Sequence, residues 1–157
     1  MGFAFRLDYV MQFFSLLGPI ILPSFLVLNS LFNNNLKGIV YLAGLVIIIT
    51  ISTLIKGLTS PKNNDMTYSP SCYVIDIGSI SVDGLRTMPC LHSVIMAFSV
   101  SYLLFPIAAR GFKEGLAASV GLLAYLVLNV LSRKMLKCVG WMGIIVGLIT
   151  GTVFGIV

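Results

Sequence analysis

Charge is scarce in this sequence of 157 residues: 10% are Asp, Glu, Lys or Arg, against about a quarter in a typical soluble domain. That shortage excludes the charged surface of a soluble protein. Histidine occurs once, which excludes any reaction that needs two imidazoles. The three cysteines contain no C-x-x-C pair, so we expect no metal site, and we predict no cofactor.

Apolar residues, in contrast, are abundant: 58% of the chain is hydrophobic and the mean hydropathy is +1.04. Because a membrane-crossing helix needs about 20 apolar residues, the chain has room for about five or six spans. We predict one all-α membrane domain over residues 1–157, a polytopic transmembrane helix bundle of about five spans. The predicted spans are residues 9–32, 38–55, 93–109, 115–131 and 138–157.

The first span contains Pro19 and Pro23, which should bend its helix. Residues 56–92 form the one long polar loop, with three basic and three acidic side chains. In residues 73–84, apolar and polar side chains alternate and the segment ends in Asp-Gly, which indicates extended structure or a turn at the membrane surface. An odd number of spans places this loop, the N-terminal lead and residues 132–137 on one face, which the positive-inside rule makes cytoplasmic.

Four glycines recur at every fourth residue of the last predicted span. They are Gly143, Gly147, Gly151 and Gly155. This spacing lines them along one side of a helix and lets another helix backbone approach closely. Packing inside the bundle is the favoured interpretation, and a homodimer face is the alternative.

Three short groups of polar residues fall at predicted helix ends on the face that carries the loop: Lys56, Pro89-Cys90-Leu91-His92 and Ser132-Arg133. Their order resembles the type 2 phosphatidic acid phosphatase (PAP2) superfamily, whose motifs read K-x6-R-P, P-S-G-H and S-R-x5-H-x3-D. The resemblance covers about residues 50–155. It implies a PAP2-like helix bundle in which Lys56 and Arg133 bind phosphate and His92 is the remnant of a catalytic residue.

The chain departs from the family pattern at the residues that carry the reaction. Val139 stands where the family has its nucleophilic histidine, and Gly143 stands where it has the aspartate that orients that histidine. Asn63 and Asn64 replace the arginine and proline of the first motif. Transfer through a phosphohistidine needs a nucleophilic imidazole and a second imidazole to protonate the leaving oxygen. We therefore expect the reaction to be absent or severely impaired.

Simpler interpretations exist for the same side chains. His92 at a helix start is typical of an interfacial polar residue, and Lys56 and Arg133 are typical of anchors for anionic lipid head groups. Basic residues beside membrane spans have this role in general, so we predict no nucleic-acid partner.

Three functions are compatible with the sequence. The first is a non-catalytic structural or assembly component of a membrane, with loop 56–92 as the surface for a protein partner. For so shortened a relative, the resemblance suggests the internal membrane of a large DNA virus. The second is an active lipid phosphate phosphatase with rearranged catalytic residues. The third is a small transporter or channel subunit, disfavoured because no charged side chain lies inside a predicted span.

Overall fold

The structure is a computed structural model that describes residues 7–59, 89–135 and 139–156. These ranges form five helices: α1 (Leu7–Phe32), α2 (Lys37–Thr59), α3 (Leu91–Arg110), α4 (Phe112–Met135) and α5 (Trp141–Ile156). No strand occurs among them, so the all-helical prediction is confirmed for this part of the chain. The predicted extended segment 73–84 lies outside the described residues, as do Cys72 and Cys138.

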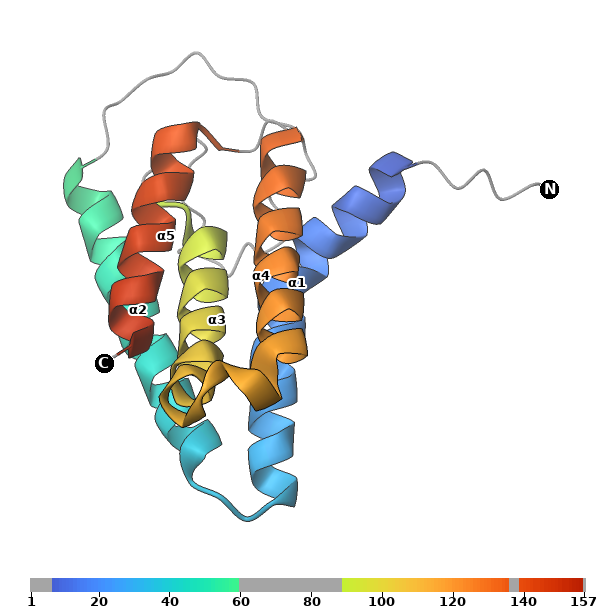
Figure 1. Cartoon of the computed structure of the whole chain (residues 1–157). Coiled ribbons are helices and arrows are strands. Elements are labelled where there is room, and N and C mark those ends of the chain that lie inside the picture. Colours follow the sequence, from blue (N-terminus) through green and yellow to red (C-terminus); the bar gives the residue numbers. More distant parts are fainter. Residues whose placement is uncertain (1–6, 60–88, 136–138, 157) are drawn as a thin grey trace.

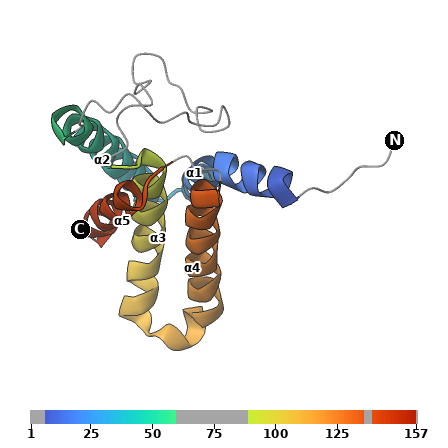
Figure 2. The ribbon, with the colours of Figure 1, turned by 90° about the horizontal axis from the view of Figure 1, so that it is seen from above.

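The helices run alternately down and up the bundle (Figure 1). At its upper end in that view, α2 and α4 finish and α3 and α5 begin. At its lower end lie the short turns that join α1 to α2 and α3 to α4. Seen from above, α5 lies against α3, and α3 and α4 form a long hairpin (Figure 2). The first turns of α3 and α5 therefore lie beside the last turn of α4.

Within the described ranges, three helices are long and apolar enough to cross a membrane: Lys37–Ile55, Leu91–Ala109 and Gly115–Met135, with mean hydropathies of 2.5, 1.7 and 1.9. The stretches Leu17–Phe32 and Trp141–Ile156 are apolar but shorter. A helix of 16 residues such as α5 is about 24 Å long, short of the roughly 30 Å of hydrocarbon in a bilayer. The prediction of a membrane protein is thus confirmed, and three helices meet the criteria for a span.

Several helix ends differ from the predicted boundaries. α3 begins at Leu91, so His92 lies in its first turn and not in the polar loop. α4 continues to Met135, beyond the predicted end at residue 131, and α5 begins only at Trp141. One reason for the longer α4 is that the hydroxyl of Ser132 donates a hydrogen bond of 2.7 Å to the carbonyl oxygen of Leu128. That polar side chain is satisfied within the helix and does not end it.

Helix α1 changes direction along its length (Figure 1). It contains Pro19 and Pro23, and a proline inside a helix removes one backbone hydrogen bond and bends the axis. The buried Gly18 lies just before the first proline. A Cβ at Gly18 would lie 2.0 Å from the side-chain nitrogen of Asn129, so the absence of a side chain there lets α4 approach α1.

The closest helix pair is α3 with α5, which run parallel. Gly147, Gly151 and Gly155 face Ser93, Ala97 and Ser101, each pair separated by the same interval along the chain. A Cβ at Gly151 would lie 2.4 Å from the carbonyl oxygen of Val94, and one at Gly155 would lie 2.7 Å from that of Phe98. We call this contact of small residues the α3–α5 seam. The side of α5 that carries Gly147, Gly151 and Gly155 thus packs against α3 inside the bundle.

A second buried cluster joins α2 to α3. It comprises Tyr41, Ile48, Val94 and Phe98. The hydroxyl groups of Tyr41 and Ser99 are 2.7 Å apart and hydrogen-bonded, and Ser99 also donates to the carbonyl oxygen of Ile95. Together with the seam, this cluster fixes α3 as the central helix of the bundle.

Candidate functional site

The first turn of α3 is held in place by its contact with α5. The backbone N–H of Cys90 donates to the carbonyl oxygen of Gly143 at 3.0 Å, and the carbonyl of Cys90 accepts from the N–H of Val94 at 3.0 Å. Pro89 and Cys90 are both buried. Cys90 has an extended backbone, with φ −71° and ψ 110°, as is usual for a residue that precedes a helix. This anchoring fixes where His92 lies.

His92 meets Arg133, which comes from the last turn of α4. The guanidinium Nη2 of Arg133 is hydrogen-bonded to the Nε2 atom of the His92 ring. Arg133 is only 5% exposed, so it does not reach into the solvent as a head-group anchor would. It also lies inside the candidate span Gly115–Met135, which corrects the expectation that no charged side chain lies within a span.

The direction of this hydrogen bond determines the state of the imidazole. A guanidinium has five N–H donors and no acceptor, so Nε2 of His92 must accept. An accepting Nε2 carries a lone pair, which puts the ring proton of His92 on Nδ1 and leaves the imidazole neutral. With Arg133 in this position, Nε2 of His92 has no proton to give to a leaving group. The pair is arranged as donor and acceptor, and not as an acid facing a substrate.

The end of α4 is a suitable place for a buried cation. The carbonyl groups of the last helical turn have a partial negative charge, which favours Lys and Arg there. Arg133 and Lys134 both lie in that last turn. Lys134 instead lies over an aromatic ring: its Nζ is 5.1 Å from the centre of the exposed Trp141 ring on α5. Tryptophan is enriched at membrane–water interfaces, and a lysine over its ring makes a favourable cation–π contact.

The structure brings together two of the three predicted polar site residues. Lys56 lies close to the end of α2, and its side chain lies outside the described part of the structure. Val139 is half-buried just before α5, and Gly143 is buried with its carbonyl oxygen bonded to Cys90. Neither of these two positions supplies an imidazole or a carboxylate. Among the described residues, no three His, Cys, Asp or Glu side chains are grouped so as to hold a metal ion.

Two further polar residues of α4 lie on the same side of the helix as Arg133, and the predicted site does not include them. Asn129 is 3% exposed and lies one turn before Arg133, and the half-buried Tyr125 lies one turn before Asn129. The interval of four residues places all three on one side of the helix. This polar spacing in an apolar run was the available signal. Asn129 packs against α1 at Gly18, so the polar side of α4 faces the inside of the bundle.

Comparisons of the chain with protein families, with curated proteins and with solved structures found no match.

Proposed function

We propose that this protein is a multi-pass integral membrane protein with a helix layout resembling that of the PAP2 superfamily, and that it is a structural or assembly component of its membrane. In this proposal the chain does not cleave phosphate esters. The observation that carries it is the contact of His92 with Arg133 at the upper end of the bundle, where Val139 and Gly143 provide no nucleophile and no carboxylate.

The contact supports the proposal in two ways. First, it joins the second and third predicted motifs, which are 41 residues apart along the chain, in one place at one end of the helices. Second, it uses the accepting nitrogen of the only imidazole, so the histidine serves the packing of α3 on α4. A hydrogen bond to a charged group stabilises a fold by about 1.5–3 kcal/mol. That is a sufficient reason for a non-catalytic protein to have these two residues.

The proposed partners are lipids and a second protein. Large apolar side chains are exposed on all five helices, so the bundle is surrounded by lipid. Basic residues at the helix ends suit anionic head groups, and loop 56–92 is the proposed surface for a protein partner. The internal membrane of a large DNA virus is the proposed location of such a component.

Replacement of the natural protein by two variants tests the structural role. His92→Gln retains a hydrogen-bond acceptor for Arg133 but cannot act as a catalytic imidazole. Gly151→Leu introduces a branched side chain into the α3–α5 seam, where even a Cβ lies 2.4 Å from a carbonyl oxygen. We expect membranes with His92→Gln to assemble normally and those with Gly151→Leu to fail. Failed assembly with a folded His92→Gln protein would contradict the proposal.

An active lipid phosphate phosphatase with rearranged residues is the second candidate, and the burial of Arg133 is the observation that favours it. Arg133 is a buried cation beside the one imidazole, and phosphoryl transfer uses such donors to neutralise developing charge. For catalysis, Nε2 of His92 has to leave Arg133 when a phosphate arrives. Release of phosphate from phosphatidic acid that stops in His92→Gln would establish this function in place of the structural one.

A further inference from the structure

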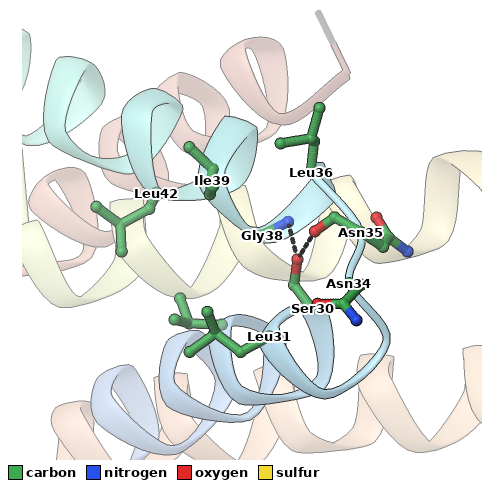
Figure 3. A pocket seen from close by; sticks show the side chains of 9 residues that line it. Ser30, Leu31, Asn34, Asn35, Leu36, Gly38, Ile39 and Leu42 are labelled. Atoms are coloured by element: carbon green, nitrogen blue, oxygen red, sulfur yellow. Dashed lines mark hydrogen bonds between the residues drawn. The ribbon is translucent and has the colours of Figure 1, made fainter.

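A cavity of about 270 Å³ lies at the lower end of the bundle, between the end of α1 and the beginning of α2 (Figure 3). It is at the opposite end of the bundle from the first turn of α3 and the last turn of α4 (Figure 1), the two turns that contain His92 and Arg133. Its lining is mainly apolar: Leu31 on α1 lies across from Ile39 and Leu42 on α2. These three side chains are 63%, 62% and 45% exposed, so no other part of the described chain covers them.

The polar atoms of the cavity are mostly used within the turn itself. The hydroxyl of Ser30 donates to the carbonyl oxygen of Asn35 and accepts from the N–H of Gly38 at 2.8 Å. The side-chain oxygen of Asn35 accepts from the N–H of Lys37 at 2.9 Å. These bonds hold α1 and α2 at a fixed distance and leave hydrocarbon as the main surface of the cavity. A polar small molecule therefore has few groups to bind there.

The size and the position of the cavity select its occupant. Small-molecule pockets usually measure about 300–1,000 Å³, so a cavity of about 270 Å³ lies just below that range. Because Leu31, Ile39 and Leu42 are 45–63% exposed, part of an acyl chain can lie in the cavity while the rest remains in the bilayer. The candidate span of α2 begins at Lys37, so Gly38, Ile39 and Leu42 lie in its first turns, at the edge of the hydrocarbon. An acyl chain is narrow, flexible and present at that depth.

We infer that this cavity holds part of one acyl chain of an anionic glycerophospholipid, with the lipid phosphate beside Lys37. Between Val27 and Leu42, Lys37 is the only charged residue, and it is an exposed cation. Because lipid tails are as apolar as leucine, the chain alone gives little preference for one lipid over another. The preference comes from the charge of Lys37, and the cavity fixes where the lipid lies.

Native mass spectrometry of the full-length protein in detergent tests this inference, with phosphatidylglycerol, phosphatidylcholine and diacylglycerol as probes. We expect the wild-type protein to retain one phosphatidylglycerol. Leu42→Trp fills the cavity from α2 and should abolish this retention. Val46→Trp is the matched control, because Val46 is exposed one turn further along the same helix and does not line the cavity.

The contribution of the head group is measured separately. One cation near a membrane surface favours an anionic lipid by about fivefold, so Lys37→Gln should weaken phosphatidylglycerol binding about fivefold and leave phosphatidylcholine binding unchanged. Lys134→Gln, at the other end of the bundle, is the control. Leu31→Trp closes the cavity from α1 and repeats the test if Leu42→Trp does not fold.

Three outcomes would overturn the inference. One is equal lipid retention by Leu42→Trp and Val46→Trp. Another is diacylglycerol binding as strong as phosphatidylglycerol binding. The third is loss of a protein dimer, and not of lipid, in Leu42→Trp, which would assign the cavity to a second copy of the chain. None of these results depends on whether His92 and Arg133 act in catalysis, so the structural proposal stands or fails separately.

Discussion

Substitution of alanine for Gly151 is the sharpest test of the packing described above. The added Cβ would lie 2.4 Å from the carbonyl oxygen of Val94, 2.8 Å from the Cβ of Ala97 and 3.0 Å from the backbone nitrogen of Phe98. Ordinary van der Waals contact begins at 3.4 Å. None of the three atoms belongs to the end of a flexible side chain, so relief requires α5 to move away from α3.

The cost can be bounded from known effects. Overpacking a close-packed site costs about 1–3 kcal/mol, and the upper part of this range applies where backbone must move. Alanine gains up to about 1 kcal/mol over glycine in helix propensity, which offsets part of that cost. We therefore expect Gly151→Ala to lower the free energy of unfolding by about 1–2 kcal/mol.

A matched control is available in α4. A Cβ at Gly121 meets nothing within 4 Å, so Gly121→Ala has the propensity gain without the clash. Gly44→Ala is intermediate, because its Cβ lies 2.9 Å from the far end of the Phe98 side chain, which can shift more easily than backbone. The assay is unfolding in detergent followed by circular dichroism. Equal stability of Gly151→Ala and Gly121→Ala would refute the close approach of α3 and α5.

Three further predictions concern polar contacts, each measured by the same unfolding assay. His92→Ala removes the acceptor of a buried guanidinium and should cost about 1.5–3 kcal/mol, whereas His92→Gln should cost clearly less; equal losses would argue against the contact with Arg133. Tyr41→Phe removes the hydrogen bond to Ser99 and should cost about 0.5–1.5 kcal/mol, and no measurable loss would contradict that bond. Trp141→Leu removes the ring below a lysine on α4 and should cost about 0.5–1 kcal/mol at low salt, with a larger loss pointing to packing and not to the cation.

The helices themselves were predictable, since apolar runs of about 20 residues between short polar segments determine them. The side of the last helix that packs was also visible, because Gly147, Gly151 and Gly155 recur at one interval. The glycine spacing does not indicate which helix packs against α5. The face of α3 that packs against these glycines consists of Ser93, Ala97 and Ser101. Small residues of these kinds are common in helices, so their role in packing is recognised only from the positions of the two helices.

The candidate site was predictable in composition but not in geometry. The motif positions indicate His92 and Arg133 as site residues, and the structure shows that the two side chains are hydrogen-bonded. The burial of Arg133 was not foreseen, because a basic residue at the end of an apolar run is typical of a head-group anchor. Its environment depends on α3, which is far away in the sequence, and on the continuation of α4 past Ser132. Such contacts between distant elements leave no periodic signal in the chain.

The most direct test of the central claim follows the phosphorus signals of phosphatidic acid in vesicles that contain the purified protein. The proposal predicts that the phosphatidic acid signal persists, that no inorganic phosphate accumulates, and that vesicles with wild-type protein, with His92→Gln and with no protein behave alike. Inorganic phosphate that accumulates with the wild-type protein and is absent with folded His92→Gln would contradict it and show that the single histidine catalyses phosphate release.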